Sequence, residues 1–124
     1  MILDTSAWVE FIEGTKRGQE VKAVLEREEN FTSIVTISEI TQWCLRNGRE
    51  NVAATIDEVK RISQILPLTE TISIGAGKLN HERKKAGKKW GMIDSMIVAT
   101  AQAYDLRILT KDYAFRDLPV AQIL

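Results

Sequence analysis

Short apolar stretches alternate along this chain with longer segments in which apolar residues recur every three or four positions. The short stretches are rich in aliphatic and β-branched residues, which is typical of buried strands, and the longer segments have the spacing of amphipathic helices. The pattern predicts strands over residues 1–4, 31–36, 65–68, 106–109 and 120–124. It predicts helices over residues 6–14, 16–28, 37–47, 50–65, 70–86 and 93–104.

This order of elements indicates the fold class. Short strands that alternate with helices favour right-handed βαβ crossovers and a parallel sheet covered on both faces. We therefore predict an α/β protein with three layers, α/β/α, a mainly parallel central sheet, and residues 120–124 as an edge strand. No repeat or Pro/Gly-rich linker interrupts the pattern, and 124 residues are enough to bury a core, so we expect a single domain over residues 1–124.

Four acidic residues fall at corresponding places in this pattern. Strand C-termini and helix N-termini share one edge of such a sheet, and open α/β sheets bind ligands there. Asp4 ends the first strand, and Asp112 lies just past the strand at 106–109. Glu39 is expected in the first turn of the helix at 37–47, and Asp94 at the start of the helix that runs to Tyr104. All four carboxylates are predicted to lie at the same edge.

Each acid also has a purely local interpretation. Asp4 could cap the first helix, since Asp is a preferred N-cap residue. Thr36 and Glu39 match the capping box S/T-x-x-E, in which the acid bonds to the start of its own helix. Asp94 could favour the positive end of a helix dipole, and Asp112 could be an exposed turn residue.

Taken together, the four acids favour a shared role. Each is embedded in apolar sequence (ILD, TISEI, GMIDSMIV and RILTKD), which places it beside the core rather than on an open surface. Carboxylates about 5 Å apart repel by roughly 3 kcal/mol per pair at an effective dielectric of 20. Such a cluster needs a cation, and ligands that are all oxygen suit Mg²⁺ or Mn²⁺.

The segments DTSAW, TISE, IDSMIVATA and LTKDYAF together resemble the PIN-domain nucleases. Their order, their spacing and the chain length are most similar to the VapC-like toxins of toxin–antitoxin pairs. The resemblance implies a metal-dependent endoribonuclease that hydrolyses RNA phosphodiester bonds with bound Mg²⁺ or Mn²⁺. It also implies a cognate antitoxin and a homodimer. Carried over residue by residue, it assigns catalysis and metal binding to Asp4, Glu39, Asp94 and Asp112, with Ser6 and Thr110 as polar supports.

One position departs from the family pattern. Some family members have a further acid just after the last of the four, where this chain has Tyr113 and Ala114. The sequence therefore leaves open whether one or two metal ions bind.

A basic run precedes Asp94 and is predicted to approach the acidic edge. Cations there could hold the phosphates that flank a scissile bond, although a charge run can also be just a solvated helix face. The candidate RNA-binding residues of this run are Arg83, Lys84, Lys85, Lys88 and Lys89.

Composition and single motif positions limit the classes of protein to which this chain could belong. Seventeen basic and seventeen acidic residues cancel, so affinity for nucleic acid must come from local clustering. With one cysteine, no apolar run of about 18 residues and no signal peptide, we expect a cytoplasmic protein without a membrane segment. A haloacid dehalogenase would need a second Asp where Ser6 stands, and a receiver domain would need paired acids after the first strand. The remaining alternative is a catalytically silent PIN-fold module that binds nucleic acid or a partner.

Overall fold

The computed structural model describes all residues 1–124 and has a five-stranded sheet at its centre. The strands are β1 (Ile2–Leu3), β2 (Phe31–Ser33), β3 (Gln64–Leu66), β4 (Ile108–Thr110) and β5 (Ala121–Ile123). They lie in the order β3-β2-β1-β4-β5 and every pairing is parallel. The first strand is therefore central, and the last strand lies at an edge as predicted.

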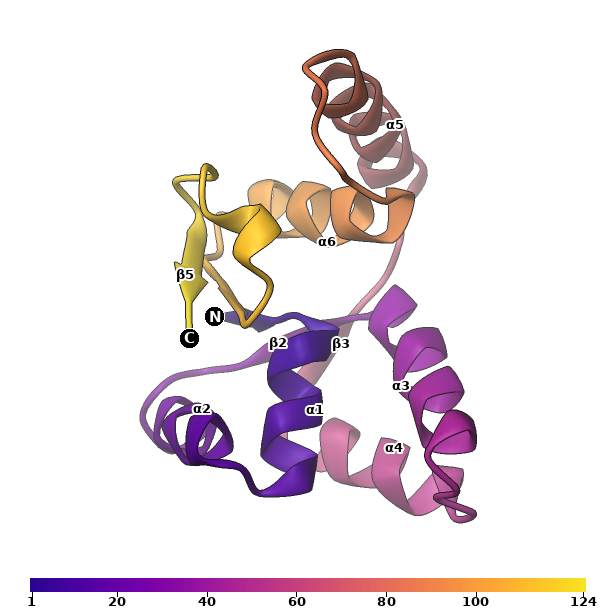
Figure 1. Ribbon diagram of the computed structural model, residues 1–124, viewed down its shortest axis with the longest axis vertical. Helices are drawn as coiled ribbons and strands as arrows, with labels where there is room; N and C mark the ends of the chain where they lie inside the picture. The colour runs from indigo at the N-terminus through magenta and orange to yellow at the C-terminus, as the bar shows by residue number, and fades with distance from the viewer.

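Six helices cover the two faces of this sheet (Figure 1). One face carries α1 (Thr5–Glu13), α2 (Lys16–Arg27), α3 (Ile34–Arg46) and α4 (Val52–Ile62). The other carries α6 (Met92–Ala103), with α5 (Glu70–Lys85) packed against it. A single 3₁₀ turn, η1 (Tyr113–Phe115), follows β4. The predicted three-layer α/β/α fold is confirmed.

The strand residues divide the core between the two faces. Adjacent residues of a strand point to opposite sides, so Leu3 packs with Trp8 under the four-helix face while Ile2 packs with Ile97 under α6. All four side chains are fully buried. Burial on both faces explains why the strands are continuously apolar rather than alternating. The burial of β1 and β4 also fixes the positions of Asp4, which directly follows β1, and of Asp112, which lies two residues beyond β4.

The boundary between β2 and α3 differs from the sequence prediction. The β-branched run at 34–36 was expected to extend the strand, but the strand ends at Ser33 and the helix begins at Ile34. The Ser33 hydroxyl caps this helix by accepting a hydrogen bond from the amide of Val35 at 3.3 Å. Thr36 is thus a buried interior residue of α3, and Glu39 lies in its second turn, not its first. The local interpretation of Glu39 as the acid of a capping box with Thr36 therefore does not hold.

Two further boundaries shift by a few residues. Helix α4 begins after Asn51, whose side chain accepts from the amide of Ala54 at 3.0 Å. Strand β4 starts at Ile108 rather than residue 106, because the amide of Leu106 still bonds to the Ala101 carbonyl at the end of α6. None of the helices is both long and apolar enough to cross a bilayer.

Candidate active site

The four acids come from four different elements at one edge of the sheet. Asp4 directly follows the central strand β1, and Asp112 lies two residues beyond its neighbour β4. Glu39 projects from α3, and Asp94 from the first turn of α6. The negative charges of the other three all raise the pKa of Asp94, so the four carboxylates share one electrostatic environment.

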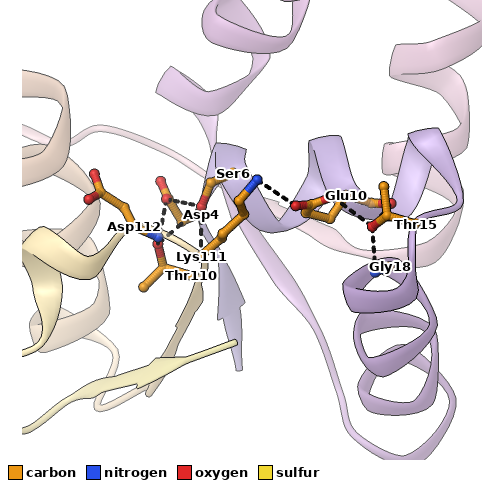
Figure 2. A network of polar contacts seen from close by, with 8 residues as sticks. All are labelled: Asp4, Ser6, Glu10, Thr15, Gly18, Thr110, Lys111 and Asp112. Carbon is orange, nitrogen blue, oxygen red and sulfur yellow. Dashed lines mark hydrogen bonds and ion pairs between the residues drawn. The ribbon is translucent and has the colours of Figure 1, made fainter.

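Asp4 is the most buried of the four, with 5% of its surface exposed. The hydroxyls of Ser6 and Thr110 each donate to its Oδ2 at 2.8 Å, and these two hydroxyl oxygens lie 3.1 Å apart (Figure 2). Burial raises the pKa of Asp4, while the hydrogen bonds from Thr110 and Ser6 oppose that rise. Asp4 occupies the N-cap position of α1 but makes no side-chain capping hydrogen bond. The local interpretation as a helix cap therefore lacks its defining contact.

Glu39 faces Asp4 across the N-terminus of α1. The Thr5 hydroxyl donates to Glu39 Oε1 at 2.5 Å. Burial raises the pKa of Glu39, the bond from Thr5 lowers it, and the charge of Asp4 raises it again. Thr5 was not identified as a support from the sequence, although it stands between Asp4 and Ser6 in the DTS segment.

Asp94 combines a local role with a shared one. Its Oδ2 accepts from the amide of Gly91 at 3.3 Å, as a residue in the first turn of a helix often does. A helix N-terminus alone would lower the pKa of a carboxyl group. Instead, burial and then the charge of Asp4 raise the pKa of Asp94 to about 6, with smaller increases from Asp112 and Glu39. The neighbouring acids and burial thus outweigh the local donor.

Asp112 is exposed and satisfies its own turn. Its Oδ1 accepts from the amide of Ala114 at 2.9 Å, and its backbone amide donates to Thr110 Oγ1 at 3.0 Å. Thr110 is therefore a common support that contacts both Asp4 and the start of the Asp112 turn. The turn interpretation describes Asp112 correctly, but its charge also contributes to the raised pKa of Asp94, after burial and the charge of Asp4.

The donor set suits a hard divalent cation, although it is not a closed cage. No group of three or more His, Cys, Asp or Glu side chains is arranged so that it could hold a metal ion as it stands. Three of the acids are each turned toward a local donor, namely the Thr5 hydroxyl, the Gly91 amide or the Ala114 amide. The only candidate ligands are carboxylate and hydroxyl oxygens, which are ligands of Mg²⁺ and Mn²⁺ rather than of zinc.

A cleft opens beside these acids. Its volume is ≈ 390 Å³, and it is lined by Thr5, Ser6, Val9, Glu39, Gln42, Trp43, Arg46, Lys111 and Asp112. The basic side chains of Arg46 and Lys111 are the cations of this lining. Neither was predicted from the sequence, because no local pattern places α3 and the segment after β4 side by side.

The basic run is divided by the structure. Arg83 is buried and binds Asp117 through two nitrogens at 3.0 and 3.1 Å and the Ala114 carbonyl at 3.0 Å. Its guanidinium also lies 3.9 Å from the centre of the Trp90 ring. The prediction that Arg83 contacts RNA is corrected accordingly, since its guanidinium joins α5 to the segment after η1. Lys84, Lys85, Lys88 and Lys89 remain exposed, and only Lys88 has an ion pair, with Asp117 at 3.6 Å.

Comparison with known families decides the classification. The family model described as PIN domain matches residues 1–121. The chain belongs to the PIN domain family. No curated protein matches the chain significantly.

Solved structures of similar fold include several toxins of toxin–antitoxin systems. A toxin–antitoxin complex from Klebsiella pneumoniae has a TM-score of 0.76 at 22% identity, covering 98% of this chain and 94% of that one. VapBC2 from Rickettsia felis, bound to a promoter DNA fragment, has a TM-score of 0.78 at 16% identity, with coverage of 99% and 96%. VapC20 from Mycobacterium tuberculosis, described as a sarcin–ricin loop cleaving toxin, has a TM-score of 0.72 at 14% identity, with coverage of 96% and 91%. At these identities the likeness shows that this PIN domain shares the fold of those toxins.

Proposed function

We propose that this PIN domain protein is a metal-dependent endoribonuclease and the toxin of a toxin–antitoxin pair. The observation that carries the proposal is the buried carboxylate of Asp4, held by the hydroxyls of Ser6 and Thr110 at the sheet edge that also carries the other three acids. Burial, and then the charges of Asp4, Asp112 and Glu39, raise the pKa of Asp94 to about 6. Strongly perturbed acids beside a cleft are typical of functional sites. The neighbour described as a sarcin–ricin loop cleaving toxin supports the choice of substrate.

In this proposal Asp4, Glu39, Asp94 and Asp112 would hold Mg²⁺ or Mn²⁺. Bound metal of this kind supplies an activated water and neutralises charge that develops on the phosphodiester. The chain's own contribution is orientation. Thr5 directs the carboxylate of Glu39, while the Ser6 and Thr110 hydroxyls hold that of Asp4, as the supports of metal ligands commonly do.

We further propose that the protein acts in the cytoplasm, as a homodimer that a cognate antitoxin inhibits. Complexes named VapBC and FitAcB among the structural neighbours support an antitoxin partner. Light scattering of the purified protein, alone and with the product of an adjacent reading frame, tests both assemblies.

The catalytic proposal is tested with labelled RNA in Mn²⁺ or in EDTA. We expect cleavage with Mn²⁺ only, and products with a 5′-phosphate, because water attacks in line and the 3′ oxygen leaves. Asp57→Asn, at an exposed position on α4, is the control and should cleave like wild type. Equal cleavage in EDTA, or none with any divalent ion across many RNAs, contradicts the proposal and favours a silent binding module.

A further inference from the structure

An ion pair between a buried carboxylate and a half-exposed lysine lies beside the acids and has no place in the function proposed so far. Glu10 of α1 has a side chain only 8% exposed, and its Oε1 lies 2.6 Å from the Nζ of Lys111 (Figure 2). The Thr15 hydroxyl donates to Glu10 Oε2 at 2.6 Å and accepts from the Gly18 amide at 3.0 Å. Both oxygens of this carboxylate are thus fixed by partners from different segments.

Lys111 stands between two parts of the candidate active site. It follows Thr110 and precedes Asp112, and its backbone amide donates to the Ser6 hydroxyl at 2.9 Å. That same hydroxyl donates to Asp4 (Figure 2). The position of the lysine backbone is therefore tied directly to the position of the most buried acid.

The ammonium group retains binding capacity after this pairing. A lysine ammonium has three donors, and Glu10 uses one of them. The Lys111 side chain is 49% exposed and lines the cleft together with Glu39 and Asp112. An ion pair with so exposed a cation contributes little to stability, which leaves its placement at the cleft to be explained.

The chemistry of the cleft indicates what this cation would bind. A polyanion that enters a cleft lined by carboxylates needs positive charge at the entrance, and phosphate oxygens are strong acceptors for an ammonium. Arg46, the other cation of the lining, is the last residue of α3 and has no ion pair. Lys111 differs from it because a buried carboxylate holds its Nζ in one place.

We propose that Lys111 binds a backbone phosphate of the substrate, and that Glu10 is a positioning residue that holds the Lys111 ammonium at the cleft. The proposal rests on the proposed function, in which the cleft receives RNA. It assigns to Lys111 a contact with substrate, and to Glu10 an effect that acts only through Lys111.

The contact by Lys111 is tested by the affinity for a fluorescein-labelled single-stranded RNA, measured by anisotropy over a range of salt. Ca²⁺ replaces Mn²⁺ so that binding is measured without turnover. Lys111→Met should raise the Kd by roughly tenfold, because a hydrogen bond to a charged group is lost. It should also reduce the slope of log K against log salt by about 0.7, the value for one phosphate on a single strand. Lys111→Arg should restore affinity and slope, and Lys22→Met on the exposed face of α2 should match wild type.

The positioning role of Glu10 is tested by Glu10→Gln, which keeps the shape of the side chain and leaves Lys111 charged. RNA affinity should change little, because Lys111 keeps its charge and can still bind a phosphate. The kcat for RNA cleavage in Mn²⁺ should fall by about 10-fold, in the range seen when supporting partners of a site are lost. If Glu10 had only a structural role, Glu10→Gln would lower the melting temperature, and kcat would not fall while RNA affinity is kept.

The outcomes for the two proposals differ. Wild-type protein that binds RNA without cleaving it contradicts the nuclease function alone, and the Lys111 variants still report on phosphate binding. A folded Lys111→Met variant with wild-type Kd and salt slope overturns the role of Lys111. Equal losses of affinity and kcat in Glu10→Gln overturn the positioning role, and wild-type protein without any affinity for RNA overturns both.

Discussion

At the scale of single residues, the contacts of Asp4 distinguish a helix cap from a member of a shared acidic site. The sequence alone allows a helix cap, because Asp at the start of a helix is a common cap. The structure places Asp4 at the N-cap position without a side-chain capping hydrogen bond. Its Oδ2 is instead held by Ser6 and by Thr110, which lies at the other end of the sequence. A buried carboxylate supported in this way is oriented for something other than its own helix.

This difference leads to a prediction for Asp4→Asn. Asn caps helices about as well as Asp, so a capping role predicts a folded protein that still cleaves RNA. Loss of a residue that supports a metal ligand typically lowers metal affinity or activity by roughly 10–100-fold. If Asp4 is itself a ligand, Asp4→Asn should therefore lower the cleavage rate by about 100-fold or more. Cleavage rates in Mn²⁺ measure the effect, and Asp57→Asn is the matched control. An active Asp4→Asn variant would remove Asp4 from the metal site.

Individual residues also mark the limit of sequence reasoning. The four acids could be found because each follows a strand or begins a helix, and this placement is visible in the local pattern. Glu10 and Lys111 could not, because their ion pair joins α1 to the segment after β4 and no periodicity records that contact. Arg83 was misjudged for the same reason, since its partner Asp117 lies after η1.

At the scale of elements, the packing of α2 against α1 depends on a single glycine. A Cβ at Gly18 would lie 2.1 Å from the carbonyl oxygen of Glu10, too close for any side chain. The two helices could not approach this closely with another residue there. The same approach brings Thr15, the N-cap of α2, within reach of the Glu10 carboxylate.

We therefore predict opposite effects for two helical glycines. Gly18→Ala should destabilise the protein by about 1–3 kcal/mol, because the α1 backbone must shift to accommodate the methyl group. Gly77→Ala in α5, where a Cβ has nothing within 4 Å, should stabilise it by roughly 0.5–1 kcal/mol through helix propensity. Urea denaturation of both variants measures these changes, and a stabilised Gly18→Ala variant would contradict the close packing.

The end of α5 and the loop after it divide the basic run into two pairs of lysines. Lys84 and Lys85 lie in the last turn of α5, whereas Lys88 and Lys89 lie in the loop that leads into α6 and Asp94. We expect Lys88→Gln with Lys89→Gln to weaken RNA binding and its salt dependence more than Lys84→Gln with Lys85→Gln, because fewer counterions are released near the site. Anisotropy across a salt series compares the pairs. If a variant that carries all four Lys→Gln changes has the RNA affinity and the salt slope of the wild type, the basic run is only a solvated surface.

Element boundaries show why a correct fold can contain wrong local assignments. The β-branched residues at 34–36 favour a strand by propensity, yet they begin α3. The Ser33 cap and the burial of Thr36 and Ile40 along one side of the helix outweigh that preference. Tertiary packing therefore decides the boundary, and Glu39 reaches the site from the second turn of α3.

At the scale of the whole molecule, the alternation of strands and helices was sufficient to predict the layers. A layered α/β fold can be predicted wherever apolar runs of strand length alternate with amphipathic helices, and both patterns are local properties of the sequence. Strand order and register depend on long-range pairing, such as Ile2 with both Phe31 and Ile108. That pairing places β1 at the centre of the sheet, and so places Asp4 between the other acids.

The same placement gives the metal-free protein an unusual dependence on pH. The pKa values of Asp4, Glu39 and Asp94 are all raised in the folded state. A raised carboxyl pKa favours folding below the unfolded value, and this contribution is lost as pH rises through the folded value. For Asp94 the window runs from 3.8 to about 6. The lowered pKa values of Glu10 and Asp117 act in the opposite direction and remove stability as pH falls below about 4.

We therefore predict that the metal-free protein is more stable near pH 5 than near pH 7, by about 1 kcal/mol from Asp94, because only the part of its window above pH 5 contributes to this difference. Asp94→Asn should remove most of this difference and raise the melting temperature in EDTA at pH 7. Saturating Mn²⁺, at about 100 times its Kd, should stabilise the wild type by about 2.7 kcal/mol at pH 7 and less at pH 5, where protons compete for the carboxylates. Asp94→Asn should gain much less from Mn²⁺. Thermal melts at both pH values, with EDTA or Mn²⁺, measure all four effects. Equal stabilisation of wild type and Asp94→Asn by Mn²⁺ would place the metal elsewhere, because repulsion among the acids and attraction to the cation must arise from the same carboxylates.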